Sequence, residues 1–325
     1  MSNVYIVSTA YHLLITVTKT LLTHREGKDV VIIMHNHISK DVLSKAAPLF
    51  NDVILNYNRF NILLNILQQK ILPQKFRFVP QIIKTQRFLN ELYLKKHNIY
   101  IFDDNSFWGC WLNVSKIKYN LIEDGLNYFK MNPHTKTNRM KLYDCLYKIL
   151  GISWDIMGKS EFVKSIEVNE NKDLYVKHTE IIECNRKAMF EKLSIVDKDI
   201  IASIFGYKPL KHFPKNNCSL LLTQPLSEDG IVTHEKKIEL YKHLIDKYAI
   251  GQLYIKPHPR ENENYSSIFP DAIIFGASKI PFEVYLLKED IHFNKVITAY
   301  STAIDAVYCA DEKISKSKEW TFNFN

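Results

Sequence analysis

Short apolar runs alternate with longer amphipathic segments along most of this 325-residue chain. The runs have the length of buried strands, and the segments between them carry a helical period. Strands separated by helices favour a parallel sheet with crossover helices, and so an α/β fold. The predicted strands are 4–9, 29–35, 52–56, 99–104, 116–125, 218–225, 250–257, 272–276 and 295–300.

Two such series are separated by a section, roughly 130–205, that we predict to be mostly helical, with 139–151 and 181–194 as its better segments. We expect two Rossmann-like, doubly wound domains that face each other across a cleft. The first would span 1–205, with the helical section as an extension, and the second 206–325. Ligands of open parallel sheets bind outside the carboxyl ends of the strands, so the residues there are the candidates for function.

The composition is that of a globular protein, with 46% hydrophobic and 24% charged residues. The five cysteines are widely spaced, which predicts neither a disulfide framework nor a zinc site. The first residues begin a strand-like run and lack the pattern of a signal peptide. No apolar run reaches the roughly 18 residues that a membrane span needs. We therefore expect a cytoplasmic protein.

A formal net charge of +8 suits an anionic partner, and much of the excess lies in the segment 59–96. This segment carries eight basic residues and one acidic residue, Glu91, interleaved with apolar ones. It is either a solvated helical hairpin or a surface for anionic lipid or an anionic glycan. Zinc-finger spacing and an RNA-binding aromatic signature are missing, so we expect no nucleic-acid partner.

Four groups of polar residues follow predicted strands. They are Glu123-Asp124-Gly125, the segment 224–230, Lys256-Pro257-His258-Pro259-Arg260, and Ser301-Thr302. Ser301 and Thr302 are either an ordinary helix N-cap or part of an anion site at the start of a helix. If the strands are neighbours, His258, Lys256 and Arg260 add cationic donors. The groups together then suit a phosphate.

Two Glu-Asp-Gly triplets place Asp124 and Asp229 after strands. Each triplet is either a turn or the source of a general base toward a sugar hydroxyl. A base combined with a histidine at a leaving phosphate is what transfer from a nucleotide sugar requires. Glycine-rich nucleotide motifs, a Gly-x-Ser-x-Gly elbow and an Asp-x-Asp motif are missing. We therefore predict no metal site and no cofactor, with His35 and His37 in a surface loop.

The sequence resembles the bacterial sialyltransferases, in particular the family of the lipooligosaccharide sialyltransferases with relatives among capsule enzymes. The resemblance rests on the order and spacing of the Glu-Asp-Gly motif, "LLLTQPLSEDG", "YIKPHPRE", "IPFEVYLL" and "AYSTA". It covers about 218–310, with "VYIVSTAYHLL" and 121–125 as shorter matches in the N-terminal half. It implies a GT-B fold, CMP-sialic acid bound mainly by the second domain, and inverting, metal-independent transfer. A homodimer is also implied.

The resemblance assigns roles to several residues at the strand ends. His258 would contact the CMP phosphate and serve as the acid, and Ser301 and Thr302 would hold the same phosphate. Glu283 matches a glutamate that binds the ribose hydroxyls. The other residues of the predicted substrate-binding site are Lys256, Gln224 and Pro259.

The base has two candidates under this resemblance. Related sialyltransferase families place it in the N-terminal acidic motif, which is Asp124 here. The lipooligosaccharide enzymes place it shortly before the His-Pro motif, where Asp229 is the counterpart. We favour Asp229, because 218–230 is the closer match to the family.

Three functions follow from these observations. The first is transfer of sialic acid from CMP-sialic acid to a galactose-type hydroxyl of a bacterial surface glycan, either lipooligosaccharide or capsule. The second is a GT-B transferase of surface polysaccharide that uses another nucleotide sugar. The third is a non-catalytic protein that binds anions or lipid through 59–96. With a lipid-linked acceptor, that segment would hold the enzyme peripherally at the inner membrane surface.

Overall fold

The structure of the chain is a computed structural model in which two compact units, Met1–Leu193 and Ser194–Asn325, are each built on a sheet of their own. The described residues are 2–34, 38–55, 96–124, 158–171, 174, 180–214, 216–299, 301 and 303–315. The predictions for 59–96 and 139–151, and for His35 and His37, lie outside these residues. Within them, no helix combines the length and the apolar character needed to cross a membrane.

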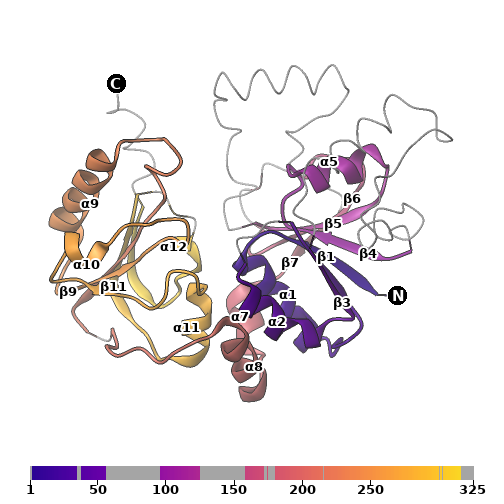
Figure 1. Cartoon of the computed structure of the whole chain (residues 1–325), viewed down its shortest axis with the longest axis horizontal. Coiled ribbons are helices and arrows are strands. Elements are labelled where there is room, and N and C mark those ends of the chain that lie inside the picture. The colour runs from indigo at the N-terminus through magenta and orange to yellow at the C-terminus, as the bar shows by residue number, and fades with distance from the viewer. Residues whose placement is uncertain are drawn as a thin grey trace. The chain divides into compact units, whose positions relative to one another are not determined.

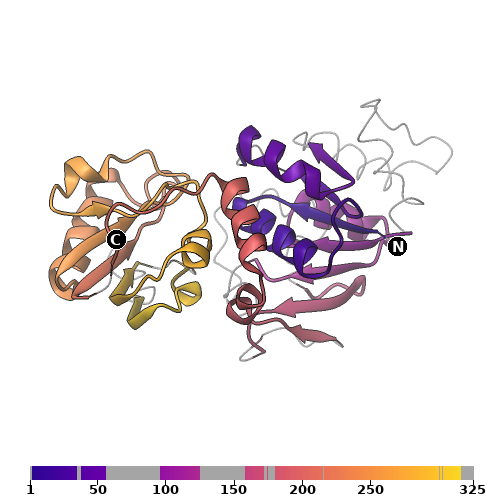
Figure 2. The same cartoon turned by 90° about the horizontal axis from the view of Figure 1, so that it is seen from below.

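The described part of the first unit forms a seven-stranded parallel sheet in the order β3-β2-β1-β4-β5-β6-β7. Helices α1 and α2 lie on one face of the sheet and α5 lies on the other (Figures 1 and 2). The strand order reverses at β1 and β4, the position at which such sheets bind ligands. The elements are β1 (Asn3–Val7), α1 (Ala10–Leu22), β2 (Val30–Ile33), α2 (Lys40–Ala46), η1 (Ala47–Leu49), β3 (Asp52–Leu55), β4 (Asn98–Ile101), α5 (Phe107–Val114), β5 (Tyr119–Ile122), β6 (Val163–Val168), β7 (Ile181–Glu183) and α7 (Arg186–Glu191).

The described part of the second unit forms a five-stranded parallel sheet in the order β10-β9-β8-β11-β12. Helices α9 and α10 lie on one side and α11 and α12 on the other (Figure 1). The order reverses at β8 and β11. The elements are α8 (Ile195–Phe205), β8 (Cys218–Leu222), α9 (His234–Tyr248), β9 (Gln252–Lys256), α10 (Tyr265–Ile268), β10 (Ile273–Ile274), α11 (Phe282–Lys288), β11 (Phe293–Thr298), α12 (Ala303–Ala306) and β12 (Ala310–Ser315).

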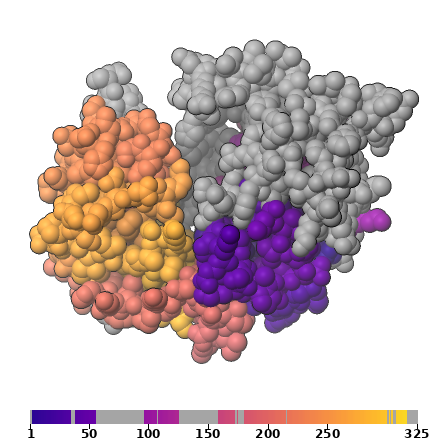
Figure 3. Space-filling model, in the orientation of Figure 1, coloured from indigo at the N-terminus to yellow at the C-terminus, as the bar shows by residue number. Residues whose placement is uncertain are grey.

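The central strands are buried because helices cover both faces of each sheet. Every residue of β2 and of β8 is buried, which is why these strands read as continuous apolar runs in the sequence. Helix α9 lies at the surface of its unit (Figure 3). It turns Leu240, Tyr241 and Leu244 inward together with one charged residue, Lys237.

The predicted α/β fold is confirmed, and each predicted strand is present within a few residues of its expected bounds. The prediction of a mostly helical section at 130–205 is wrong at β6 and β7. Segment 181–194 begins as a strand, because Ile181 pairs with Ile166, and only after Asn185 has capped its first turn does α7 follow. The last helix, α12, is short, since β12 pairs with β11 from Ala310 onward.

The boundary between the two units lies earlier in the chain than the predicted division at 205 and 206. Helix α8 belongs with the second unit because it packs on α11. An ion pair between Asp199 and Lys288 joins these helices, and the Tyr207 hydroxyl just after α8 donates to Glu289.

Candidate active site

Three neighbouring strands of the second unit end in one row. Leu222 of β8 lies opposite Lys256 of β9 on one side and Thr298 of β11 on the other. His258 follows β9 by two residues and Ser301 follows β11 by three, so their loops flank the carboxyl end of β8. Adjacent strands are about 4.8 Å apart, which puts the ends of β9 and β11 about 10 Å from each other. The strand order therefore places these two loops on either side of the end of β8.

His258 is fixed through its backbone and through one ring nitrogen. Its N–H donates to Glu261 Oε2 at 2.8 Å and to Thr223 Oγ1 at 3.1 Å. The Arg260 N–H donates to Nδ1 of the ring at 3.2 Å, so the neutral ring carries its proton on Nε2. Burial and the positive charge of Arg260 lower the pKa of His258 to about 4. At neutral pH the ring is therefore uncharged and presents an Nε2–H donor.

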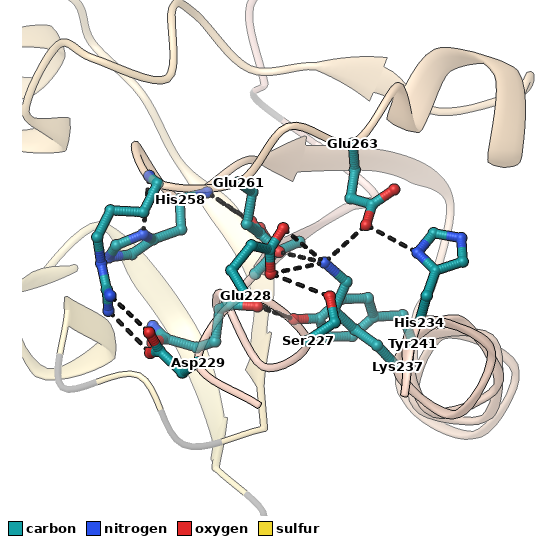
Figure 4. Close-up of polar contacts among 12 residues, drawn as sticks. Ser227, Glu228, Asp229, His234, Lys237, Tyr241, His258, Glu261 and Glu263 are labelled. Atoms are coloured by element: carbon teal, nitrogen blue, oxygen red, sulfur yellow. Dashed lines mark hydrogen bonds and ion pairs between the residues drawn. The ribbon is translucent and has the colours of Figure 1, made fainter. Parts of the chain in front are cut away.

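A buried ammonium joins the loop of His258 to the loop that follows β8 (Figure 4). Lys237 is fully buried, and its Nζ lies 3.1 Å from Glu228, 3.4 Å from Glu261 and 2.9 Å from Glu263. Burial disfavours the charged ammonium, yet these carboxylates raise the pKa of Lys237 above its usual value. The Tyr265 hydroxyl also donates to Glu261, at 2.6 Å. Because Glu228 lies on one loop and the other two carboxylates on the next, Lys237 holds both loops in place.

Asp229 forms a bidentate ion pair with Arg260. The two guanidinium nitrogens lie 2.6 Å and 2.9 Å from the two carboxylate oxygens. Both side chains are partly exposed, at 34% for Asp229 and 49% for Arg260. The structure therefore places Asp229 beside the His258 loop, and both of its oxygens accept hydrogen bonds from a permanently charged group.

Lys256 is turned into the protein. Its Nζ donates to the carbonyl oxygens of Ala277 at 2.5 Å, Ile280 at 3.1 Å and Ser278 at 3.4 Å. An ammonium has three hydrogens, so these contacts use all of them. Burial lowers the pKa of Lys256 to about 7, against the opposing charge of Glu283. Glu283 is buried in the first turn of α11, and burial raises its pKa. The described contacts thus give Lys256 a structural role, and its contact with a phosphate stays a prediction.

Ser301 is buried at the start of α12. Its hydroxyl accepts from the Ala303 N–H at 3.2 Å, and its own N–H donates to Thr298 Oγ1 at 3.0 Å. The Ser301 hydroxyl thus satisfies a backbone N–H at the start of α12, as a capping residue would. The hydroxyl still has a hydrogen to donate to a ligand. Thr302, the second member of the predicted pair, lies outside the described residues.

The loop after β8 is held at its first residue. The Gln224 N–H donates to the Tyr241 hydroxyl at 2.7 Å, and that hydroxyl donates to the Gln224 carbonyl at 3.0 Å. Pro259 is exposed directly after His258. Both predicted binding residues thus lie on the two loops that Lys237 joins.

The edge of the sheet in the first unit carries a histidine–aspartate pair. Asp124 follows β5, and its Oδ1 lies 2.5 Å from Nε2 of His12, which is in the first turn of α1. His12 is fully buried, whereas the Asp124 side chain is 36% exposed. The ring stacks on Phe102 with centroids 4.3 Å apart, and the Ser8 N–H donates to its Nδ1 at 3.2 Å. The His12 N–H donates to Thr9, the N-cap of α1.

A second carboxyl group lies near this pair. Asp103 follows β4, where burial and the charge of Asp124 raise its pKa to about 6, while an N–H from Asn105 opposes the shift. Gly109 allows α5 to approach this loop, since a Cβ there would lie 2.0 Å from the Asp104 carbonyl oxygen. The carboxyl edge of the sheet in the first unit therefore carries two acidic side chains, Asp103 and Asp124.

Sequence analysis missed His12, Asp103, Lys237 and Glu261 as members of the site. Lys237 had a usable signal, because it shares the apolar face of its helix with Leu240 and Leu244 at helical spacing. His12 stands within an apolar run directly after a predicted strand. A polar residue on a buried helical face is the signal that these two positions share.

The described residues offer proton donors and acceptors at two sheet edges. The second unit presents the Nε2–H of His258 and the hydroxyl of Ser301, which suit a phosphate. The first unit presents the carboxylate of Asp124, which can accept a proton from a hydroxyl. No group of three or more His, Cys, Asp or Glu side chains among these residues is arranged to hold a metal ion.

Comparison with known proteins identifies the family of the chain. The sequence model of glycosyltransferase family 52 matches residues 51–316. An uncharacterized protein of Haemophilus influenzae is 33% identical over 225 residues, which are 66% of this chain and 68% of that protein.

Two solved structures are similar in fold. One is the α/β-galactoside α-2,3-sialyltransferase of Photobacterium phosphoreum, with a TM-score of 0.58 and 13% identity over 96% of this chain and 89% of that chain. The other is a 2,6-sialyltransferase of Photobacterium sp. JT-ISH-224 in complex with CMP and lactose. Its TM-score is 0.55, with 12% identity over 97% of this chain and 71% of that chain.

At these identities the structural likeness shows the fold alone, and it confirms the predicted α/β fold of GT-B type with two Rossmann-like domains. The family match extends over most of the sequence and includes the whole sheet of the second unit and Asp124 of the first, but not His12. The chain therefore belongs to glycosyltransferase family 52.

Proposed function

We propose that this glycosyltransferase moves sialic acid from CMP-sialic acid to a galactose-type hydroxyl of a bacterial surface glycan. We propose further that the transfer inverts the anomeric centre and needs no metal ion. The observation that carries the proposal is the row of strand ends in the second unit, where His258 and Ser301 flank the end of β8. The complex of CMP and lactose with a sialyltransferase of similar fold supports the same donor and acceptor classes.

The CMP phosphate would be bound by the second unit. The Nε2–H of His258 and the hydroxyls of Ser301 and Thr302 are donors of the kind that phosphate oxygens accept. A phosphate beside the ring favours the protonated imidazole, because opposite charges stabilise each other. The pKa of His258, which is about 4 in the free protein, should therefore rise when the nucleotide binds. Binding of CMP would then be accompanied by uptake of a proton.

The transfer is a single displacement at C2 of the sialic acid. The oxygen of the acceptor hydroxyl forms a bond to C2, and the bond from C2 to the phosphate oxygen breaks. The electron pair of that bond leaves with CMP, where the protonated His258 stabilises it and gives up its proton. The hydroxyl proton passes to a carboxylate, either Asp124 or Asp229. Each of these steps uses a group that the chain provides.

The remaining predicted residues would bind the nucleotide. Glu283 lies in the first turn of α11 and would accept from the ribose hydroxyls, in a buried environment that would strengthen such bonds. Gln224 and Pro259 would border the phosphate on their loops, while Lys256 would support the pocket through the turn that it holds.

The first test of the proposal is the choice of nucleotide. At a concentration 100 times its dissociation constant, a ligand stabilises the folded state by about 2.7 kcal/mol. We expect CMP to raise the melting temperature, and UDP and GDP to leave it unchanged. Stabilisation by UDP or GDP alone would contradict the proposed donor and favour another nucleotide sugar.

The second test is activity. Incubation with CMP-sialic acid and either lactose or N-acetyllactosamine, in the presence of EDTA, should yield a sialylated product. Failure to transfer to any galactose-terminated acceptor would overturn the proposal. Membrane contact through 59–96, a lipid-linked acceptor and a homodimer stay predictions from the sequence.

A further inference from the structure

Two separate ion-pair contacts join the loop after β8 to the loop after β9 in the second unit. The buried contact is that of Lys237, which reaches Glu228 on the first loop and Glu261 on the second. The exposed contact is the bidentate pair of Asp229 and Arg260. Each member of this pair is the chain neighbour of one of the buried carboxylates. Asp229 and Lys237 lie on opposite sides of the cluster (Figure 4).

The exposed contact is not needed to hold the loops together. Lys237 is fully buried and already joins them, whereas the Asp229 and Arg260 side chains are 34% and 49% exposed. Ion pairs with this exposure contribute little to stability. The pair of Asp229 and Arg260 is therefore better explained by what it does at the edge of the sheet, next to solvent, than by the folding of the unit.

Arg260 contacts both the predicted acid and one of the two candidate bases. Its backbone N–H donates to Nδ1 of His258 at 3.2 Å, which leaves the ring proton on Nε2. Its guanidinium nitrogens lie 2.6 Å and 2.9 Å from the two oxygens of Asp229, and such a fork fixes the plane of the carboxylate. An ionised carboxylate has about four lone-pair sites, so each oxygen can still accept from a hydroxyl.

We propose that Arg260 is a positioning residue, which orients the Asp229 carboxylate as the base of the transfer and ties it to His258. This inference rests on the proposed function. In the step, the acceptor oxygen bonds to C2, the bond from C2 to the phosphate oxygen breaks, and its electron pair leaves with CMP. Asp229 takes the hydroxyl proton, and His258 gives its proton to the phosphate oxygen. Arg260 keeps all of its protons.

The charge of Arg260 also links the two proton transfers. Burial and the charge of Arg260 lower the pKa of His258, the charges of Asp229 and Glu228 raise it, and that of Lys256 lowers it. When Asp229 takes up the hydroxyl proton, its negative charge is lost and the charge of Arg260 is no longer balanced. The proton of His258 is then released more readily to the departing CMP, so the base helps the acid to act.

The kinetic test changes the Arg260 side chain and retains the backbone N–H that binds the His258 ring. Arg260→Met removes the guanidinium, and Arg260→Lys keeps the charge without the bidentate contact. We expect the Met variant to lower kcat about 10- to 100-fold, because a displaced base reacts slowly, and the Lys variant to recover part of the loss. KM for CMP-sialic acid should stay within about threefold. The melting temperature should stay within a few degrees.

The matched control for the kinetic test is Lys242→Met, which removes the same charge from the exposed face of α9. It should leave kcat within about threefold of the wild type. Wild-type kcat in Arg260→Met, or an equal loss in the control, would overturn the proposal.

A double-mutant cycle separates positioning from direct binding of the phosphate. If Arg260 acts through Asp229, then Arg260→Met should cause no further loss of kcat in an Asp229→Asn background. If the guanidinium binds the phosphate instead, the affinity for CMP should fall by the same factor in both backgrounds. That result, or an equal loss of kcat in both, would contradict the proposal.

A spectroscopic test depends on neither the donor nor turnover. In protein labelled with ¹⁵N-histidine, the His258 signal is assigned by its loss in His258→Gln. Near the pKa of His258, at about pH 4, the protonated fraction of the ring should rise in Arg260→Met, fall in Asp229→Asn and stay unchanged in Lys242→Met. A loosened loop would instead expose the ring and raise the fraction in both loop variants. A rise in both, or a change in neither, would overturn the inference.

The two levels of the proposal fail in different ways. Wild-type protein that does not turn over CMP-sialic acid contradicts the proposed function. Normal turnover by the wild type together with an unchanged kcat in Arg260→Met contradicts only the role of Arg260.

Discussion

The carboxyl edges of the two sheets each present a histidine whose Nδ1 accepts a backbone N–H. Ser8 supplies that hydrogen to His12 in the first unit, and Arg260 supplies it to His258 in the second. Both rings therefore direct an Nε2–H outward. The recipients differ: His12 is fully buried and gives its proton to Asp124, whereas no described residue accepts from His258 at Nε2.

The positions of the histidine and the carboxylate are reversed between the two edges. In the first unit a buried imidazole supports a partly exposed carboxylate. In the second, the buried carboxylate of Glu261 accepts the backbone N–H of His258 and so supports a half-buried imidazole. The comparison shows that in each case the more exposed side chain is the one that can reach a ligand, and that the buried side chain holds it in place. The buried residue is a hydrogen-bond donor, His12, where it holds the carboxylate of Asp124. It is an acceptor, Glu261, where it holds the backbone N–H of His258.

The largest expected effect comes from removing the reacting group of the second edge. His258→Gln should lower kcat about 10²- to 10⁴-fold, because it removes the acid at the leaving phosphate. The melting temperature should stay within a few degrees, since backbone bonds hold this loop. Turnover of CMP-sialic acid measures the first effect and calorimetry the second. Wild-type turnover in this variant would contradict the proposal that His258 acts at the leaving phosphate.

The supporting group of the second edge is expected to matter for stability. Lys237→Met leaves three carboxylates without their buried cation, and removing one member of a buried pair typically costs about 3–5 kcal/mol. We expect this loss in the hydrogen-exchange protection of β8 and β9. Lys242→Met, on the exposed face of the same helix, is the matched control and should change stability by less than about 0.5 kcal/mol. Equal effects of the two changes would show that the network contributes little.

The low pKa of His258 predicts that the stability of the second unit depends on pH. Between about 4, its pKa in the folded protein, and its ordinary value of about 6.5, the unfolded chain binds a proton that the folded chain does not. The stability of the second unit is therefore unaffected above about pH 6.5 and falls by about 3 kcal/mol as the pH is lowered to about 4.

Urea denaturation of the wild type and of His258→Gln over this pH range tests the linkage. The variant should lack this part of the loss, so the difference between the two proteins should change as the pH falls. Saturating CMP should reduce the dependence in the wild type, because the phosphate favours the protonated ring. Parallel stability curves for the two proteins would contradict the linkage.

The smallest effect is expected at the exposed ion pair. Asp229→Asn removes a surface salt bridge, so we expect the free energy of unfolding to fall by only about 0–1 kcal/mol. Urea denaturation is the measurement. A loss well above about 1 kcal/mol would show that the pair with Arg260 contributes more than an exposed ion pair usually does.

Much of the fold could be predicted because parallel strands covered on both faces appear as apolar runs. Two of the three missed strands, β12 and β7, share a reason. In β12, four of six residues are exposed, with only Ile314 buried among them, so no apolar run marks an edge strand. Strand β7 has three residues and depends on its pairing with Ile166. Short edge strands are fixed by their neighbours rather than by their own sequence.

The site was predictable where a residue follows a strand, and less so where a contact joins distant segments. His258, Ser301 and Asp124 were found because parallel sheets bind ligands at one edge. The bond between His12 and Asp124 joins positions 112 residues apart, and no local pattern encodes such a distance. The ion pair between Asp229 and Arg260 was not predicted for the same reason. The sequence indicated Arg260 only as a cationic donor to a phosphate, and the structure shows it bound to the Asp229 carboxylate.

The buried ammonium in the second unit also constrains how the family can vary. Lys237 balances the charges of Glu228, Glu261 and Glu263, which lie on two different loops. A relative that replaced the lysine with an apolar residue would retain several acidic groups with no cation to balance them. We therefore expect these four positions to change together, so that related chains carry either the complete set or a neutral substitute for all of it. Correlated substitution at these four positions among related chains would then be evidence for the contact, which cannot be read from one sequence alone.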